Sequence, residues 1–393
     1  MTDLSINPID EESLAHNRLA HLRDHMVSAG LDLCVLTSPI SIRYATGYRG
    51  YAAFQAHIPT QYLTVPVEGP VVLFGAYTDR LSTIDRCETA HSVTAFDAGL
   101  ATGDAALRFT HDIERGLAES GLDQTSIVGI ERLTPMGFKV LHGSPIRIAD
   151  AEGVVELARS RKLPEEHDAI AYSVAVAELG IERMRATLKP GVTENQLFAM
   201  LHHTNIEHDG DWIDGRMLCS GPRTNPWYQE ASARRIEEGD LVAFDTDMIG
   251  PNGYCADISR TWVCGDSPTP SQFELYRRAR AEIEHNIELL KVGASFRDLS
   301  DRSFRQPDEF IANRYACVLH GVGMSDEFPK IPYPQDWHWT GYDGELEAGT
   351  VLSVESYVGA EGGAEGVKLE QMVQVTDDGV IPLSTSPLWD DAG

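Results

Sequence analysis

Residues 241–262 constrain the fold more than any other stretch of the chain. The apolar run from Leu241 to Phe244 leads into two carboxylates, Asp245 and Asp247, and turn-forming residues then fill positions 249–253. A second extended run presents Asp257. This pattern predicts a β-hairpin that carries acidic side chains. Buried carboxylates this close in sequence repel one another strongly without a cation, so the end of the hairpin is either solvated or a metal site.

Three residues further along the chain favour the metal site. His320, Glu355 and Glu370 each end or interrupt a short β-prone run, so each could point from a strand into a shared cavity. Together with Asp245 and Asp257 they form an oxygen-rich set with one imidazole, which suits iron, manganese, cobalt or zinc. Bridging carboxylates in such a set would hold two divalent ions about 3.5–4 Å apart.

The order Asp, Asp, His, Glu, Glu resembles that of the pita-bread metallopeptidases, which include methionine aminopeptidase, prolidase and creatinase-like proteins. The segment Gly253 to Thr261 is similar to their second-aspartate motif. Residues 220–230, 243–247 and 315–327 look most like the DddP-type dimethylsulfoniopropionate lyases of that superfamily. The similarity covers residue 165 to the C-terminus well and the first part of the chain more loosely.

The chain is long enough for two or three domains, and the resemblance implies an α/β (α+β) protein with two. Residues 1–157 would form a creatinase-like N-terminal α/β domain, with a helix over 16–29 and strands at 32–37, 70–75 and 126–129. The charged segment 158–167, which contains Pro164, marks the boundary. Residues 158–393 would form a pita-bread catalytic domain with pseudo-twofold symmetry.

A weak internal repeat bears on that symmetry. Residues 188–197 match residues 290–299 at Leu, Lys, Gly, Thr or Ser, and Leu. Each segment follows a long amphipathic helix, turns at glycine and restarts a helix with a capping hydroxyl residue. Two ordinary helix–turn–helix segments would match this well by chance; the sharper interpretation is two related halves that close around a central site.

Two departures from the peptidases weaken the expectation of amide hydrolysis. The peptidases have a histidine at the place of Trp227, and a second one at the segment Ser325 to Pro329, which has none here. An indole cannot pass a proton to a departing amine.

The resemblance therefore implies a metal-dependent lyase that splits dimethylsulfoniopropionate into dimethyl sulfide and acrylate by β-elimination. Asp326 matches the residue that acts as base, Tyr315 matches the active-site tyrosine, and Asp247 becomes a further metal ligand. Aromatic faces attract sulfonium as they attract quaternary ammonium. The residues expected to bind the substrate in this way are Trp227, Tyr315, Trp337 and Trp339.

Other interpretations of these residues stay open. Asp326 could be an ordinary loop aspartate or a helix cap, and Tyr315 could be plain core. Trp337 and Trp339 could belong to a surface loop instead of one that covers the substrate. The alternative functions are a dinuclear Xaa-Pro aminopeptidase or dipeptidase and a creatinase-fold binding protein without activity. We expect two divalent ions, iron first, with zinc, manganese or cobalt as alternatives.

The net charge and the cysteine pattern limit which partners and which cellular compartment we expect. With 32 basic and 60 acidic residues the net charge is −28, which argues against nucleic acid or an anionic membrane as a partner. The six cysteines form no CxxC pair, and Met1 to Ser5 begin a polar leader without the features of a signal peptide. We expect a cytoplasmic homodimer that acts on a small zwitterionic substrate.

Overall fold

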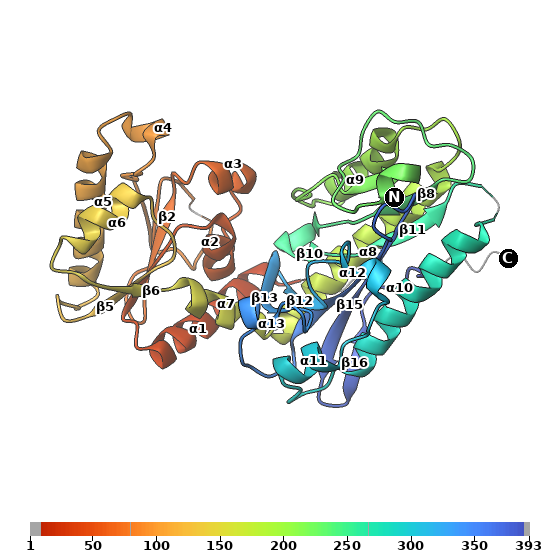
Figure 1. Ribbon diagram of the computed structural model, residues 1–393. Coiled ribbons are helices and arrows are strands. Elements are labelled where there is room, and N and C mark those ends of the chain that lie inside the picture. The colour runs from red at the N-terminus through yellow and green to blue at the C-terminus, as the bar shows by residue number, and fades with distance from the viewer. Residues whose placement is uncertain (1–8, 79, 266, 389–393) are drawn as a thin grey trace. The chain divides into compact units, whose positions relative to one another are not determined.

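The computed structural model describes residues 9–78, 80–265 and 267–388 (Figure 1). The chain divides into two compact units between Arg159 and Ser160, and the predicted domain boundary between residues 157 and 158 stays a prediction. The segment Met1 to Ser5, on which the expectation of no signal peptide rests, lies outside the described residues. No helix of the described residues combines the length and the apolar character that a membrane span requires.

The first unit, Pro8–Arg159, is built on a mixed sheet with the strand order β4-β3-β2-β1-β5-β6. Its strands are β1 (Leu33–Leu36), β2 (Tyr62–Pro66), β3 (Val72–Phe74), β4 (Arg86–Glu88), β5 (Ile127–Ile130) and β6 (Arg147–Asp150). Its helices are α1 (Glu11–Ala29), α2 (Pro39–Thr46), α3 (Ala52–His57), α4 (Ala95–Ala98), α5 (Thr102–Glu119), α6 (Pro135–His142) and α7 (Glu152–Ser160). The predicted helix and strands of this part are present.

The ends of α1 follow from the sequence. The carboxylate of Asp10 accepts a hydrogen bond of 3.0 Å from the amide of Ser13, which caps the first turn. Gly30 ends the helix at φ 70°, a left-handed conformation in which glycine is unstrained. The helix begins five residues before the predicted start at residue 16 because the acidic first turn, Glu11 and Glu12, also suits a helix N-terminus.

The second unit, Ser160–Gly393, holds three sheets, ordered β11-β8-β7, β10-β9 and β13-β12-β14-β15-β16. Its strands are β7 (Leu218–Ser220), β8 (Leu241–Phe244), β9 (Met248–Ile249), β10 (Cys255–Ala256), β11 (Arg260–Val263), β12 (Leu319–Val322), β13 (Asp326–Ile331), β14 (Val351–Val358), β15 (Val367–Thr376) and β16 (Gly379–Pro382). Its α-helices are α8 (Pro164–Thr187), α9 (Glu194–Glu207), α10 (Pro270–Glu288), α11 (Phe296–Arg302), α12 (Asp308–Ile311) and α13 (Trp337–Thr340), with short 3-10 turns at Gly221–Thr224 and Pro251–Gly253.

The internal repeat corresponds to two similar helix pairs. Helix α8 is followed by α9, which Thr193 caps by accepting from the amide of Gln196 at 3.1 Å. Helix α10 is followed by α11, which Ser295 caps by accepting from the amide of Asp298 at 3.1 Å. Gly191 and Gly293 turn the chain at φ 91° and 75°. The repeated residues are therefore the turns and caps that each pair needs.

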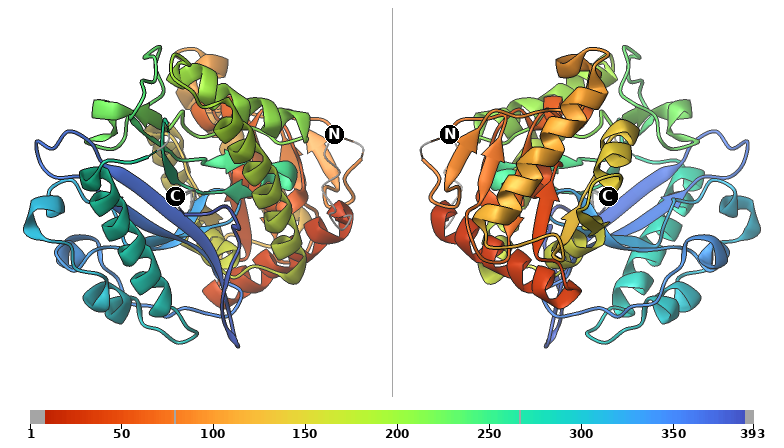
Figure 2. Two further views of the ribbon diagram at one scale, coloured as in Figure 1. Left: turned by 90° about the vertical axis from the view of Figure 1, so that its right-hand side faces the viewer. Right: turned by 90° about the vertical axis from the view of Figure 1, so that its left-hand side faces the viewer.

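The main core of the second unit lies between α10 and the five-stranded sheet. Helix α10 packs on β14 and β15, and Figure 2 shows it alongside these strands. Tyr276, Ala279 and Ile283 face Leu352 and Val354 across this layer, all of them buried. Burial of such side chains is the main stabilising term, and it fixes the two strands that carry Glu355 and Glu370.

Candidate metal centre

The hairpin predicted over residues 241–262 is present and is paired at two separate levels. Strand β8 pairs with β11 at the base, and β9 pairs with β10 near the tip. Asp245 and Asp247 follow β8, and Asp257 follows β10. The three aspartates therefore occupy the gaps between the two paired levels, where the strand ladder is interrupted, rather than the strands themselves.

Thr246 joins the two arms of the hairpin at this gap. Its hydroxyl donates to the carbonyl of Ala256 over 2.7 Å and accepts from the amide of Ile258 over 2.9 Å. Asp247, the next residue, has φ 36°, in the left-handed region that side chains other than glycine rarely adopt. The buried hydrogen bonds of Thr246 hold this strained conformation, so the local structure serves to place carboxylates.

The five-stranded sheet supplies the other predicted ligands. His320 lies on β12, Glu355 on β14 and Glu370 on β15, and the two glutamates are register partners. His320 Nε2 lies 3.3 Å from Glu355 Oε1, 3.5 Å from Asp257 Oδ2 and 3.9 Å from Glu370 Oε1. Neighbouring strands and the hairpin thus bring one imidazole and several carboxylates to one point.

Two overlapping groups of potential ligand atoms result, each within 4.8 Å: Asp257 with His320, Glu355 and Glu370, and Asp257 with Asp245 and Asp247. Three buried carboxylate oxygens here lack a hydrogen-bond partner among the described residues: Asp245 Oδ1, Asp257 Oδ1 and Glu370 Oε1. A buried carboxylate oxygen without a partner is unfavourable unless a cation binds it. The donor set therefore fits divalent ions, with Asp257 common to both groups.

Burial and mutual repulsion raise the pKa values of the three aspartates of this cluster. Burial and repulsion by Glu370 raise the pKa of Asp245 to about 6, and the same two causes raise that of Asp257 well above its ordinary value. Burial and the charge of Asp245 likewise raise the pKa of Asp247. The metal-free cluster therefore retains protons that a divalent ion would displace.

Lys368 places a fully buried ammonium among these carboxylates. From β15, its Nζ lies 2.6 Å from Glu355 Oε2, 3.2 Å from Asp245 Oδ2 and 3.3 Å from Glu370 Oε2. It also donates to the hydroxyl of Ser259 over 2.6 Å. Burial alone opposes the charge, but the three carboxylates raise the pKa of Lys368 well above its ordinary value. The side chain is thus a fixed positive charge.

Asp326 lies at the edge of the cluster, at the start of β13. Its Oδ1 is 3.9 Å from His320 Nδ1, and its side chain is 65% exposed. Desolvation beside the cluster and the negative charges of Glu370 and Asp245 raise the pKa of the Asp326 carboxyl, although His320 opposes the shift. Asp326 thus has the imidazole on one side and solvent on the other.

The turn that leads to Asp326 is held from two sides. The carbonyl of Gly323 accepts a 2.7 Å hydrogen bond from the amide of Cys255, which ties the turn to the acidic hairpin. A Cβ on Gly323 would lie 2.3 Å from Glu327 Oε2, so a larger residue there would displace the Glu327 carboxylate. Glu327 in turn accepts a 2.8 Å hydrogen bond from the buried Nζ of Lys162. The backbone around Asp326 is therefore fixed.

Two of the four aromatic residues expected to bind the substrate border this cluster. Trp227 is 4% exposed and packs in a group with Tyr357, against which Tyr315 also packs. Nζ of Lys368 lies 4.5 Å from the ring centroid of Tyr315 and 5.8 Å from that of Trp227. The Nε1–H of Trp227 has no partner among the described residues. Tyr228 stacks on Tyr315 at 5.6 Å.

Two family models cover most of the chain. Residues 168–377 match the model of metallopeptidase family M24, and residues 18–161 match that of the creatinase/prolidase N-terminal domain. The chain belongs to metallopeptidase family M24. The structure is also similar to that of an Xaa-Pro dipeptidase from Bacillus anthracis, with a TM-score of 0.75 and 21% identity over 95% of this chain and 98% of that one. The expected pita-bread fold with a creatinase-like first part is confirmed.

Two relatives of the chain carry the same description. The dimethylsulfoniopropionate lyase DddP of Roseovarius nubinhibens is 35% identical over 90% of this chain and 81% of the relative. The dimethylsulfoniopropionate lyase DddP of Roseobacter denitrificans is 32% identical over 96% of this chain and 87% of the relative. The predicted resemblance to the DddP type is therefore confirmed.

Membership of family M24 implies a centre for divalent metal ions, and the acidic cluster has the ligands for one. The predicted ligands that the structure brings together are Asp245, Asp247, Asp257, His320, Glu355 and Glu370. Their individual roles stay predictions.

No contact found among the described residues joins Trp337 or Trp339 to the acidic cluster. They lie on the short helix α13, where an irregular loop was expected. Arg297 covers the ring of Trp337 at 4.9 Å, and Trp337 packs against the core beside α10. Trp339 is 79% exposed and lies against His338. Their expected part in substrate binding stays a prediction.

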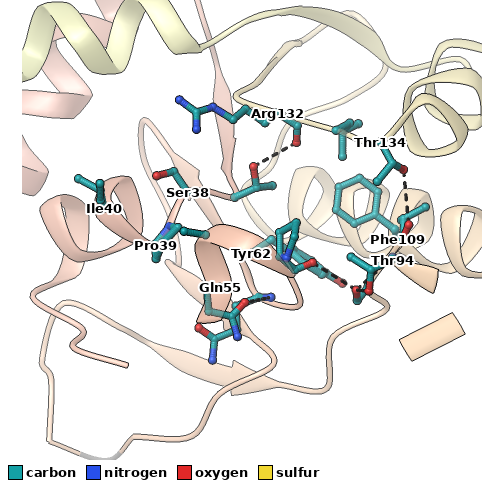
Figure 3. Close-up of a pocket in the computed structure, with 16 residues that line it drawn as sticks. Ser38, Pro39, Ile40, Gln55, Tyr62, Thr94, Phe109, Arg132 and Thr134 are labelled. Atoms are coloured by element: carbon teal, nitrogen blue, oxygen red, sulfur yellow. Dashed lines mark hydrogen bonds between the residues drawn. The ribbon is translucent and has the colours of Figure 1, made fainter. Parts of the chain in front are cut away.

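The first unit contains a cavity of about 330 Å³ beyond the ends of β1 and β5 (Figure 3). Ser38, Tyr62, Thr94 and Phe109 are among its lining residues. Arg132 supplies a charged side chain to the lining, and its guanidinium pairs with Glu152 at 2.8 Å. The described lining includes no carboxylate or imidazole, so this cavity lacks the acid–base groups of the M24 cluster.

Lys368 is the residue of the cluster that sequence reasoning missed. Its position contains the necessary signal, because it precedes Glu370 by two residues in an apolar strand. Alternate residues of a strand share a face, so a ligand role for Glu370 also places Lys368 at the metal centre.

Proposed function

We propose that this chain is a metal-dependent carbon–sulfur lyase that converts dimethylsulfoniopropionate into dimethyl sulfide and acrylate. The observation that carries the proposal is the position of Asp326, 3.9 Å from His320 at the open edge of the acidic cluster. The two relatives described as dimethylsulfoniopropionate lyases support the choice of substrate.

The reaction is a β-elimination within one molecule. A base removes a proton from the carbon next to the carboxylate, the carbon–carbon double bond forms, and the carbon–sulfur bond breaks with its electrons going to sulfur. Dimethyl sulfide leaves as a neutral molecule, so its departure needs no general acid. A site without the peptidase histidines is therefore sufficient for this chemistry.

Asp326 is the proposed base. Its carboxylate is open to solvent on one side, which gives a substrate access, and its raised pKa makes it a stronger proton acceptor than an ordinary aspartate. The proton that it takes leaves to solvent from the same exposed side. Tyr315 is proposed to orient the substrate through its hydroxyl.

The metal ions would be held by the six acidic and imidazole residues of the cluster. When bound, they supply positive charge that binds the substrate carboxylate and stabilises the charge that develops on it. We propose iron as the metal in the cell. Zinc, manganese and cobalt are the alternatives, because an oxygen-rich set with one imidazole suits all four metals.

The sulfonium end would lie against the aromatic wall of Trp227 and Tyr315. Aromatic faces attract such cations, but the ammonium of Lys368 already lies 4.5 Å from the centroid of Tyr315. Like charges repel, so the sulfonium would use ring surface that Lys368 does not cover. The zwitterion would thus be oriented with its carboxylate toward the cluster, and Trp337 and Trp339 would close over it.

We also propose a cytoplasmic homodimer. The six cysteines are free, which suits a reducing compartment. Exposed aromatic residues of the first unit, with Tyr51 at 81% and Phe96 at 66%, suit an interface between two copies. Phe96 contacts Phe54 with ring centroids 5.8 Å apart, so the two exposed rings form one aromatic surface.

The second candidate function is an Xaa-Pro aminopeptidase or dipeptidase. It is favoured by the family and by the similarity to an Xaa-Pro dipeptidase structure. Against it, the indole of Trp227 cannot protonate a departing amine.

The two candidates differ in their products. The metal-loaded protein is incubated with dimethylsulfoniopropionate, and dimethyl sulfide is measured in the headspace and acrylate in solution. The same preparation is incubated with Xaa-Pro dipeptides, and free proline is measured. We expect sulfide and acrylate in equal amounts and no proline. Efficient peptide cleavage without sulfide would reject the lyase.

A further inference from the structure

We infer that Lys368 is a positioning residue of the metal centre: it holds the outer oxygens of three carboxylates so that their other oxygens face the metal ions. The inference rests on the metal dependence in the proposed function, and it is independent of which substrate the enzyme takes.

Lys368 contacts one oxygen of each of three carboxylates and leaves the other oxygen uncontacted. Its Nζ lies 2.6 Å from Glu355 Oε2, 3.2 Å from Asp245 Oδ2 and 3.3 Å from Glu370 Oε2. The second oxygens are the ones directed at the cluster: Asp245 Oδ1 and Glu370 Oε1 have no hydrogen-bond partner, and Glu355 Oε1 lies 3.3 Å from His320 Nε2. One oxygen of each carboxylate is anchored by Lys368, and the other oxygen is directed at the cluster.

Ser259 strengthens this arrangement at Glu370. Its hydroxyl donates to Glu370 Oε2 over 2.8 Å and accepts from Lys368 Nζ over 2.6 Å. The outer oxygen of Glu370 thus has two donors, while its inner oxygen has none. Hydrogen bonds to the outer atoms of metal ligands fix ligand orientation and raise metal affinity.

The charge count agrees with this arrangement. The proposed ligand set contains five carboxylates: Asp245, Asp247, Asp257, Glu355 and Glu370. Two divalent ions supply four positive charges, and the ammonium of Lys368 supplies the fifth. Removal of the ammonium would leave a net buried negative charge, which is strongly unfavourable in a low-dielectric interior.

Lys368 does not act as a substrate ligand. The residue has no exposed surface, and its ammonium is enclosed by the three carboxylates, Ser259 and the ring of Tyr315. Lys368 acts through the ligands that it orients. Its removal should therefore change metal affinity directly, and the turnover number only as a consequence.

The test compares two buried lysines. Lys368→Met removes the ammonium at the metal centre, and Lys162→Met removes one from the pair with Glu327, in which both side chains are 1% exposed. Both variants lose a buried ion pair and should unfold at lower temperature. Only Lys368 contacts proposed metal ligands, so only its variant should bind metal differently.

The probe is Co²⁺, titrated into metal-free protein and followed by visible absorption, with metal content measured by mass spectrometry. We expect the wild type and Lys162→Met to bind two ions with the same spectrum. Lys368→Met should bind about 10- to 100-fold more weakly or lose one ion. Unchanged Co²⁺ binding in Lys368→Met, or equal weakening in Lys162→Met, would overturn the inference.

Lys368→Arg covers the case in which Lys368→Met does not fold. Arginine keeps the charge but changes the donor geometry, so we expect two bound ions with a shifted Co²⁺ spectrum. A spectrum and affinity identical to those of the wild type would contradict a positioning role. Normal Co²⁺ binding by the wild type without dimethyl sulfide release would refute the proposed function and leave this inference standing.

Discussion

Glu355 and Glu370 face each other directly across the antiparallel strands β14 and β15, and neither has any exposed surface. Like charges at directly opposed positions destabilise a sheet. Lys368 lies within 3.3 Å of both glutamates and offsets part of the repulsion. The pairing of these two glutamates therefore favours metal binding and lowers the stability of the metal-free protein.

Glu370→Gln should separate these two effects. Loss of one charge should raise the melting temperature of the metal-free protein by about 1–3 °C, because a charge repulsion is removed. The same change should abolish the stabilisation by added metal, since a ligand oxygen is lost. Thermal unfolding in a chelator and in excess Mn²⁺ measures both.

Glu282→Gln is the matched control. Glu282 is equally buried, but its carboxylate accepts hydrogen bonds from Tyr333, Ser356 and Gln306. We expect a lower melting temperature and unchanged metal content. A Glu370→Gln protein that is less stable than the wild type without metal, yet still binds Mn²⁺ normally, would show that the repulsion is unimportant.

The stability of the metal-free protein should rise as the pH falls from 8 to 5. Burial and neighbouring charge raise the pKa of Asp245 to about 6 and hold those of Asp247 and Asp257 well above the ordinary value. A carboxyl with a raised pKa in the folded state contributes most below its unfolded pKa, and that contribution is lost as the pH rises through the folded pKa.

The metal-loaded protein should respond in the opposite direction, because protons compete with metal for the same oxygens. Melting temperatures at half-unit steps of pH, with and without saturating Mn²⁺, should therefore converge toward pH 6. Parallel curves for the two forms would indicate that the cluster does not bind the metal.

Asp326→Asn should reduce the release of dimethyl sulfide by about 10²- to 10⁴-fold, the usual contribution of a positioned base. Metal content should stay at the wild-type level because Asp326 is at the edge of the cluster and largely exposed. Rates by gas chromatography and metal by mass spectrometry report the two properties separately. Asp377→Asn, an exposed aspartate after β15, should change neither. Loss of metal in Asp326→Asn would make the residue a ligand instead of the base.

Tyr315→Phe should lower the turnover number and leave metal content unchanged. The ring stays in place between Lys368 and Tyr228, so packing is preserved and only the hydroxyl is lost. Full activity in this variant would restrict Tyr315 to a packing role, the alternative that the sequence leaves open.

The sequence predicts the acidic hairpin well because its features are local: the apolar run, the turn residues and the second extended run lie within 241–262. It also places His320, Glu355 and Glu370 on strands, where the structure has them. The interruption of the ladder at the aspartates was not predictable, because it depends on the left-handed backbone of Asp247 and on the hydrogen bonds of Thr246.

Two other features depend on tertiary contacts. A single lysine in a strand is most often solvated, so the two-residue spacing to Glu370 places Lys368 at the cluster only once Glu370 is known to face the hairpin and β14. The aromatic segment at Trp337 and Trp339 has no periodic pattern that reports its partner. Its contact with Arg297 is set by α11, which is distant in sequence.

The hydrogen bond from Cys255 to the carbonyl of Gly323 ties the turn before Asp326, the proposed base, to the acidic hairpin through backbone atoms alone. Side-chain substitutions can change the charge of the turn or of the hairpin, but they leave this backbone hydrogen bond in place. The spacing between the proposed base and the proposed metal ligands is therefore set by backbone geometry, whereas their chemistry is set by side chains.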